Sequence, residues 1–436
     1  MKYSVITFGC RVNQADSLGF EEELLTAGAV AAPPQDADLV IVNTCSVTAT
    51  ADQGTRQTIR RIARDNPNAR IVVTGCYATR RPDEIAALPN VERVIANDDK
   101  PRLIQLLRRP EKAGEIAEYA EKNVVSAIFA PSVVFSERDA DGPCGATIEP
   151  GVAGRTAFTL RVQTGCAEPC SYCIIPTTRG TPRSVRVEEI VREVARVAKA
   201  GFKEVALTGV HLGSYGRDLQ PASSLIELLG ALDFPNILFR ISSLEPMDCP
   251  REIVDLVASS DRFAPHFHLP LQHASNRVLA AMGRPYTIEY YASLADDIRD
   301  RMPNASIGSD IIVGFPGETD DDVDQLAGYL ERSPLTHLHV FPYSDRPGTP
   351  ASTMTRKVDG AVVRDRGRRI RDIGRALSER FRASQVGTTH RALTLEDGSL
   401  AVTENYLKVR IPPGRARNEW VRLRMTSQDD GELLGG

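Results

Sequence analysis

Apolar and polar positions alternate in a strand–helix order near the start of the chain. Three short runs rich in Val and Ile predict buried strands: KYSVITFGC, ADLVIVNTC and ARIVVTGCYA. Between them, SLGFEEELLTAG and TADQGTRQTIRRIARDN have helix-like patterns. Strands that alternate with helices favour a parallel sheet with helices on its faces. We therefore predict an N-terminal parallel α/β sheet domain over residues 1–105.

A second strand–helix series begins at about residue 155. Its predicted strands are AFTLRVQTGC, EVALTGVHLG, LFRISSLEP, FHLPLQH, SIGSDIIVGFPGE and LHVFPYS, with helices such as VEEIVREVARVAKAG and SNRVLAAMG between them. Six strands with intervening helices indicate a partial, TIM-like β/α barrel over residues 155–383, and an open doubly wound sheet is the alternative. The Pro- and Gly-containing stretch 106–154 is interpreted as a linker.

The last part of the chain has two different patterns. A basic helical stretch runs from Arg356 to about Arg382 and contains ten Arg or Lys against four acidic residues. After it, residues 384–436 read as short strands separated by turns. This pattern predicts a small C-terminal β-barrel.

Composition narrows the class of protein. Hydrophobic residues make up 42% and charged residues 25%, which is typical of a globular chain. The net charge of −4 argues against a uniformly basic nucleic-acid binder, so any RNA contact has to come from local basic patches. The N-terminus lacks the apolar core of a signal peptide, and no run of about 18 apolar residues occurs. We expect a cytoplasmic protein with no membrane association.

Three of the eight cysteines form a compact motif. Cys166, Cys170 and Cys173 have C-x3-C-x2-C spacing directly after a predicted strand. Three thiolates at this spacing can hold three irons of a [4Fe-4S] cluster and leave the fourth iron open to S-adenosylmethionine. A zinc site or a structural loop is the alternative, but structural zinc normally takes four ligands and no obvious fourth ligand is near in the sequence.

Three more cysteines, Cys10, Cys45 and Cys76, each end a predicted N-terminal strand. Because the carboxyl ends of parallel strands share one edge, these side chains are expected to meet there. They predict a second cluster, and buried core cysteines are the alternative. For Cys144 in the linker and Cys249 after LEPMD, we expect ordinary structural roles.

Several motifs in order carry a family resemblance: TFGCRVNQADS, NTCSVTATAD, VVTGCYA, VQTGCAEPCSYCIIPTTRG, LTGVHLGSYGRD, RISSLEP, HLPLQHASNRVLAAMGRPYT and DIIVGFPGET. The chain resembles radical S-adenosylmethionine methylthiotransferases over nearly its whole length, and its final module resembles their RNA-binding TRAM barrel. TFGCRVNQADS and TENYLKV are most similar to the branch that acts on N6-threonylcarbamoyladenosine at position 37 of tRNA. The branches for isopentenyladenosine and for a ribosomal-protein aspartate usually have Gln-Met-Asn and Pro-Lys-Asn after the first Cys, where this chain has Arg11, Val12 and Asn13.

The resemblance implies two [4Fe-4S] clusters and S-adenosylmethionine as cofactors. Cys166, Cys170 and Cys173 match the radical-generating site, whereas Cys10, Cys45 and Cys76 match an auxiliary site that holds the sulfur to be transferred. One S-adenosylmethionine would donate the methyl group, and a second would supply the radical that abstracts hydrogen from carbon 2 of the base. The implied partners are the tRNA anticodon stem-loop, an electron donor such as flavodoxin or ferredoxin, and iron–sulfur assembly machinery.

Cofactor contacts are expected at the carboxyl ends of the barrel strands. We predict that Tyr172 packs on the adenine, that Gly209 allows close backbone approach, and that polar groups bond the amino group or ribose. The candidates for those polar contacts are Ser243, Glu245, Gln272 and Asp310. For each polar side chain, the alternative is that it caps a loop.

RNA contacts are expected from basic side chains. Arg56, Arg60 and Arg64 are spaced by four on one predicted helix and so share one face. The other candidates lie in the basic stretch and the tail: Arg368, Arg369, Lys408 and Arg410. For the stripe of Arg56, Arg60 and Arg64, an ordinary solvated surface is the alternative, and the basic stretch and the tail are the better candidates.

Two rival functions remain open. The first is the same chemistry on a protein side chain, which predicts no RNA retention by the C-terminal module. The second is a non-catalytic iron–sulfur tRNA-binding protein, which predicts no reductive cleavage of S-adenosylmethionine.

Overall fold

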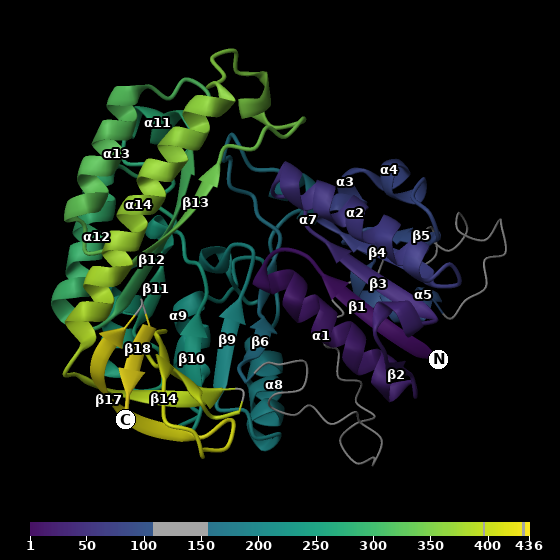
Figure 1. Ribbon diagram of the computed structural model, residues 1–436, viewed down its shortest axis with the longest axis horizontal. Helices are drawn as coiled ribbons and strands as arrows, with labels where there is room; N and C mark the ends of the chain where they lie inside the picture. Colours follow the sequence, from purple (N-terminus) through teal and green to yellow (C-terminus); the bar gives the residue numbers. More distant parts are fainter. Residues whose placement is uncertain (108–155, 396, 430–431) are drawn as a thin grey trace. The chain divides into compact units, whose positions relative to one another are not determined.

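The chain forms two compact units in the computed structural model, which describes residues 1–107, 156–395, 397–429 and 432–436 (Figure 1). The first unit takes in the described parts of Met1–Ile148 with Thr164–Ala167 and Ile174–Thr181. The second takes in those of Glu149–Gln163, Glu168–Cys173 and Pro182–Gly436. From residue 108 onward the predicted linker, with Cys144, lies outside the described residues.

The first unit is a parallel five-stranded sheet with the order β2-β1-β3-β4-β5. Its strands are β1 (Lys2–Thr7), β2 (Val30–Ala31), β3 (Leu39–Thr44), β4 (Arg70–Gly75) and β5 (Val91–Ile95). Its helices are α1 (Arg11–Thr26), α2 (Ala49–Asp65), α3 (Cys76–Arg80), α4 (Pro82–Ala86), α5 (Leu103–Leu107) and α7 (Ile175–Arg179). The predicted parallel α/β sheet is confirmed.

Helices cover both faces of this sheet because its central strand is apolar on both sides. All six residues of β3 are buried. Val40 packs in one apolar cluster with Ile59 of α2, whereas Ile41 packs in another with Phe20 of α1. A strand buried on both faces reads as a continuous apolar run, as LVIVNT does at its start.

The second unit contains a partial barrel of six parallel strands. They form two sheets, with the orders β10-β9-β6 and β11-β12-β13, and an isolated bridge between Phe239 and Phe263 links them. The strands are β6 (Phe158–Arg161), β9 (Glu204–Thr208), β10 (Leu238–Ile241), β11 (His266–His268), β12 (Ser306–Val313) and β13 (His337–Pro342). The predicted incomplete β/α barrel is confirmed. Two short strands, β7 (Gln163–Thr164) and β8 (Arg183–Ser184), pair separately.

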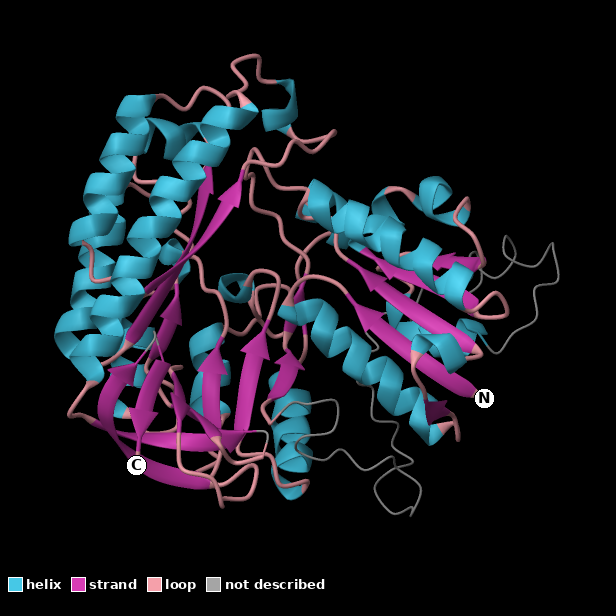
Figure 2. Cartoon of the chain, in the orientation of Figure 1, coloured by secondary structure: helices cyan, strands magenta, loops and turns pink. Residues whose placement is uncertain are grey.

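Helices cover the outer side of these strands (Figure 2). They are α8 (Val187–Lys199), α9 (Leu225–Ala231), α10 (Arg251–Ser259), α11 (Asn276–Ala281), α12 (Ile288–Arg301), α13 (Asp320–Arg332) and α14 (Gly360–Gln385). Leu338 of β13 lies against Gly374 of α14, where an added Cβ would be 3.3 Å from the leucine Cβ. Leu338 therefore points outward to α14, and because side chains alternate along a strand, its two neighbours in β13 point to the barrel interior. Among the described residues, no helix has the length and apolar character needed to cross a bilayer.

The C-terminal strands close into a small barrel, β14-β15-β16-β18-β17, as the tail pattern predicts. They are β14 (Thr389–Leu395), β15 (Leu400–Thr403), β16 (Lys408–Arg410), β17 (Trp420–Asp429) and β18 (Glu432–Gly435). Buried Arg240 of β10 pairs with Glu204 and stacks on Tyr406, with the guanidinium carbon 4.4 Å from the ring centre. This contact and a 2.8 Å hydrogen bond from Asn405 to the Asn304 carbonyl fix the small barrel to the amino ends of the larger barrel's strands.

Candidate iron–sulfur and cofactor sites

Cys10, Cys45 and Cys76 lie at the carboxyl ends of three neighbouring strands. Cys10 is the residue before α1, Cys45 follows β3, and Cys76 begins α3 directly after β4. Gly9, with φ +92°, lies so close to Cys45 that an added Cβ would be 2.7 Å from its Sγ. Cys10 and Cys76 are also both near enough to raise the pKa of Cys45. The structure thus brings together the three cysteines that strand ends predict.

Two buried cations lie beside these thiols. Lys100 Nζ is 2.7 Å from Asp16 Oδ2, and Arg179 donates a 2.5 Å hydrogen bond to Asn13 Oδ1. Burial opposes ionisation of Cys76, but the charges of Arg179 and Lys100 outweigh burial and lower the pKa of this thiol. At Cys45 burial dominates and raises the pKa to about 11.

This donor set suits an anionic iron–sulfur cluster. The three cysteines lie at one sheet edge, and thiolates are the usual ligands of [4Fe-4S] clusters. The side-chain amide of Asn97, which donates a 2.7 Å hydrogen bond to the Thr178 carbonyl, lies 3.8 Å from Cys76 Sγ. Hydrogen bonds to cluster sulfurs and nearby positive charge both stabilise the bound anion.

The C-x3-C-x2-C segment lies between β7 and α7, and a tight turn fixes its start. Gly165 has φ +76°, and an added Cβ would be 1.9 Å from the carbonyl oxygen of Thr181. The backbone N–H of Cys166 donates a 3.0 Å hydrogen bond to the Gly180 carbonyl. Only glycine fits this close approach, so the position of Cys166 depends on Gly165.

Arg284 links the motif to a predicted cofactor residue. Its Nη1 donates a 3.0 Å hydrogen bond to Cys170 Sγ, and its Nη2 pairs with Glu245. Burial raises the pKa of Glu245 even though Arg284 opposes that shift. Arg284 therefore connects Glu245 to Cys170, because it pairs with the carboxylate of Glu245 and donates a hydrogen bond to Cys170 Sγ.

The other predicted cofactor residues are in varied settings. Gly209 lies against Gln163: an added Cβ would be 3.0 Å from Gln163 Oε1, which accepts hydrogen bonds from the backbone N–H groups of Val210 and His211. Tyr172 packs against an apolar cluster that contains Met282 and Phe315. Ser243 is exposed, and Gln272 is buried with φ +66°. Their contacts with S-adenosylmethionine stay predictions.

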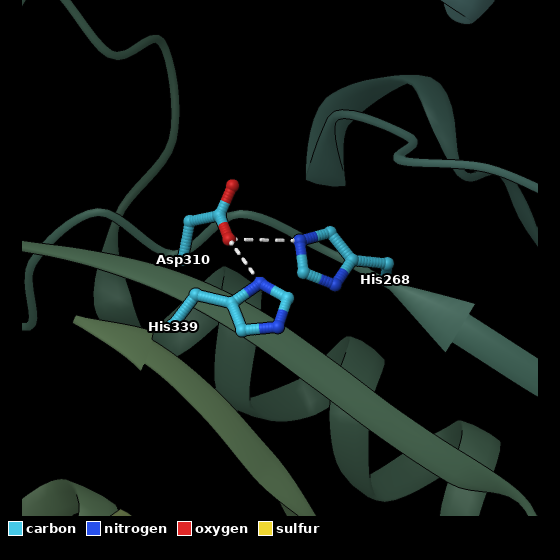
Figure 3. Close-up of side chains that lie close together, drawn as sticks. All are labelled: His268, Asp310 and His339. Carbon is cyan, nitrogen blue, oxygen red and sulfur yellow. Dashed lines mark hydrogen bonds and ion pairs between the residues drawn. The ribbon is translucent and has the colours of Figure 1, made fainter. Parts of the chain in front are cut away.

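Asp310 lies in the middle of β12 and bonds two histidines on the strands beside it (Figure 3). Its Oδ1 is 3.0 Å from His268 Nε2 and 3.1 Å from His339 Nδ1. Burial opposes ionisation of Asp310, but the two hydrogen bonds outweigh it and lower the pKa of this carboxyl. Asp310 thus belongs to a hydrogen-bonded network within the barrel and does not cap a loop.

The predicted RNA-binding residues are exposed or partly exposed, and several have acidic neighbours. Arg56 bonds Tyr77 and Glu84, while Arg60 and Arg64 are exposed. Four of the predicted residues besides Arg56 form ion pairs with acidic neighbours: Arg64 with Asp65, Arg368 with Asp365, Arg369 with Asp324 and Arg410 with Glu432. Lys408 is exposed. Exposed ion pairs contribute little free energy and exchange easily for phosphate, so these residues stay predictions of RNA contact.

Some residues that build these sites did not emerge from the sequence. Arg179 and Asn13 stand inside the motifs CIIPTTRG and CRVNQ, and their closeness in sequence to the cysteines was the available signal. Lys100, Arg284 and His339 stand in segments with no comparable signal, because their partners are distant in sequence.

A partial β/α barrel with a three-cysteine motif after its first strand defines the radical S-adenosylmethionine class of enzymes. Residues 160–330 match the Radical SAM superfamily, and residues 2–96 match a family described as Uncharacterized protein family UPF0004. The chain belongs to the radical S-adenosylmethionine methylthiotransferase family and uses [4Fe-4S] and S-adenosylmethionine as cofactors.

Two relatives and one solved structure illustrate the similarity. The chain is 37% identical to the threonylcarbamoyladenosine tRNA methylthiotransferase MtaB of Aquifex aeolicus, over 94% of this chain and 96% of the relative. It is 32% identical to the tRNA-2-methylthio-N(6)-dimethylallyladenosine synthase of Carboxydothermus hydrogenoformans, over 90% and 87%. The radical S-adenosylmethionine methyltransferase TsrM of Kitasatospora setae shares the fold, with a TM-score of 0.53 and 17% identity over 80% of this chain and 74% of that one.

Proposed function

We propose that this enzyme converts N6-threonylcarbamoyladenosine at position 37 of tRNA to its 2-methylthio derivative. The observation that carries the proposal is the 37% identity, over nearly the whole chain, to a relative named for this activity. The three cysteines at the edge of the N-terminal sheet support it, because a second cluster site in addition to the radical motif suits sulfur transfer. The related dimethylallyladenosine synthase supports tRNA as the substrate class.

The two cysteine sets have separate roles in this proposal. Cys166, Cys170 and Cys173 hold one [4Fe-4S] cluster, and Cys10, Cys45 and Cys76 hold the other. When bound, the clusters supply the electron that splits S-adenosylmethionine and carry the sulfur that reaches the base. The protein residues hold these groups in place: Arg284 donates to Cys170 Sγ, and Arg179 and Lys100 place positive charge beside Cys76.

RNA binding is assigned to the C-terminal barrel and the basic helix α14. Phosphate contacts from their exposed Arg and Lys side chains position the RNA, while the modified base is identified by shape and stacking. The anticodon stem-loop is the part of tRNA that carries position 37. A cytoplasmic location, a flavodoxin or ferredoxin as electron donor and delivery of clusters by assembly machinery complete the proposal.

Mass spectrometry of tRNA nucleosides tests this function. Cells that lack the protein should accumulate N6-threonylcarbamoyladenosine without the methylthio group and lose its 2-methylthio form. The intact gene should restore the 2-methylthio form. Loss of 2-methylthio-isopentenyladenosine instead would assign the enzyme to the other tRNA branch. Unchanged tRNA with loss of a methylthio group from a ribosomal protein would remove tRNA from the proposal.

A further inference from the structure

Three side chains on neighbouring strands form a polar network inside the partial barrel (Figure 3). His268, Asp310 and His339 come from β11, β12 and β13, and the carboxylate of Asp310 lies between the two rings. Because Leu338 lies against α14, its neighbour His339 points to the opposite, interior side. The network therefore faces the space that the strands enclose.

One member of the network is open to a ligand. The exposed fraction of the side chain is 10% for His268, 27% for Asp310 and 58% for His339. Asp310 Oδ1 accepts from Nδ1 of His339, which leaves the imidazole Nε2 of His339 without a partner among the described residues. The ring is thus held by its bond to Asp310, and its second nitrogen can bond a ligand.

A metal ion is the first alternative explanation for this geometry. The three side chains offer ligand atoms within 4.8 Å of one another, and two histidines with one carboxylate can bind divalent metals. However, a histidine that binds a metal normally gives its other ring N–H to a carboxylate or carbonyl. Neither His268 nor His339 has such a second partner within the described ranges, and hydrogen bonding to Asp310 already accounts for both rings. The geometry favours a hydrogen-bonding site.

An exposed aromatic ring lies on the same face of β13, one step nearer the carboxyl ends of the strands. Phe341 is 41% exposed, and its ring centre is 6.4 Å from that of His339. Exposed aromatic side chains are common stacking surfaces for unpaired bases. Phe341 and His339 thus place a stacking surface directly next to a polar group.

The shape of the base relates this arrangement to the reaction. In adenine the C2–H bond and the C6–N6 bond point in different directions from one ring. If C2 faces the cofactor at the carboxyl ends of the strands, the N6 substituent extends away from it. A base stacked near Phe341 would direct that substituent deeper, toward His339.

We propose that His339, oriented by Asp310 and His268, hydrogen-bonds the polar N6 substituent of the base and selects threonylcarbamoyladenosine over isopentenyladenosine. This inference rests on the proposed function. The threonylcarbamoyl group carries a carboxylate, a hydroxyl and a urea, all able to bond an imidazole. An isopentenyl group has none of these and would bury His339 and Asp310 without a new partner, which is costly. A site built to bond a polar group rejects analogues that lack it more strongly than an apolar pocket rejects extra atoms.

The test compares wild-type holoenzyme with His339→Phe, His339→Gln and the control His337→Gln. His337 is a suitable control because it faces the same side of β13 but bonds Thr336. Each protein is given S-adenosylmethionine, reductant and tRNA carrying either N6-threonylcarbamoyladenosine or isopentenyladenosine. Methylthio product, iron content and 5′-deoxyadenosine formed without tRNA are measured.

We expect His339→Phe to lower kcat/KM on the threonylcarbamoyl substrate by roughly 100-fold or more, while iron content and tRNA-independent 5′-deoxyadenosine stay at wild-type levels. His339→Gln should recover much of the activity, and His337→Gln should stay close to wild type. Equal activity of wild type and His339→Phe on the threonylcarbamoyl substrate would overturn this inference and leave the proposed function intact. A wild-type enzyme inactive on that substrate would instead overturn the proposed function. Stoichiometric Mn2+ binding that Asp310→Asn abolishes would replace the inference with a metal centre.

Discussion

Arg179 is the residue whose position most constrains the N-terminal site. It is buried, donates to Asn13 and lowers the pKa of Cys76 together with Lys100. A buried guanidinium needs anionic partners. Asp16 is one, and the thiol of Cys76, whose pKa is lowered, is another. The environment of Arg179 therefore indicates that negative charge gathers at this sheet edge.

We predict that Arg179→Met loses about half of the iron of the reconstituted enzyme, because two four-iron clusters give about eight irons per chain. Arg179→Lys should keep more iron, because it retains the charge. The exposed Arg102, paired with Asp99, provides the control Arg102→Met, which should keep all of it. Iron analysis after anaerobic reconstitution measures the effect, and full iron in Arg179→Met would contradict a cluster at this edge.

Cys249 is a buried thiol whose pKa is raised, in contrast to that of Cys76. Burial, with a smaller contribution from Asp248, raises its pKa to about 12, and its side chain is almost inaccessible. We predict that Cys249→Ala keeps the wild-type iron content and lowers the free energy of unfolding by only about 1 kcal/mol. Thiol labelling should reach Cys249 only on unfolding. Loss of iron in Cys249→Ala would give this residue a ligand role.

At the scale of elements, the turn at Gly165 places the radical motif. We predict that Gly165→Ala loses about half of the iron, because its Cβ would overlap the Thr181 carbonyl and displace Cys166. Gly28→Ala is the control, since Gly28 also has positive φ but lies after α1, away from the turn, and an added Cβ would meet nothing within 4 Å. That control should cost only about 1–2 kcal/mol of backbone strain and keep its iron. Similar iron in the two variants would show that the turn is not required.

Helix α14 offers a test of RNA contact. We predict that changing Arg368 and Arg369 to Gln weakens tRNA binding and reduces its salt slope by roughly 0.7–0.9 for each phosphate that the variant no longer neutralises. Arg332→Gln on neighbouring α13 is the control and should change neither quantity. Binding titrations at several salt concentrations measure the slope. An unchanged slope in the double variant would remove these two residues from the RNA interface.

The sequence predicted the elements with strong local patterns. The three N-terminal strands and the six barrel strands followed from apolar runs, and three strand-end cysteines followed from parallel topology. The short strands β2 and β5 and the helices α12 and α13 were not predicted, because their apolar positions are sparse or interrupted by charge. The His268–Asp310–His339 network was also out of reach, because it depends on strand register and not on spacing in the chain.

For the whole molecule, the proposed mechanism requires two clusters of equal iron content. We predict that replacing Cys166, Cys170 and Cys173 together by Ala leaves about half of roughly eight irons, and that replacing Cys10, Cys45 and Cys76 does the same. The Cys249→Ala protein is the control for removal of a cysteine as such. A wild-type value near four that the N-terminal replacement leaves unchanged would exclude the auxiliary cluster.

The two cysteine sets perform different steps in the proposed mechanism, and one measurement tests this division directly. The variant with Ala at Cys10, Cys45 and Cys76 is incubated with reductant, S-adenosylmethionine and tRNA carrying N6-threonylcarbamoyladenosine. We expect it to form 5′-deoxyadenosine, because the radical motif is intact, and to form no methylthio nucleoside, because the sulfur has no site. Wild type should form both products. Methylthio nucleoside from the triple variant would show that these three cysteines are structural and would contradict the two-cluster mechanism.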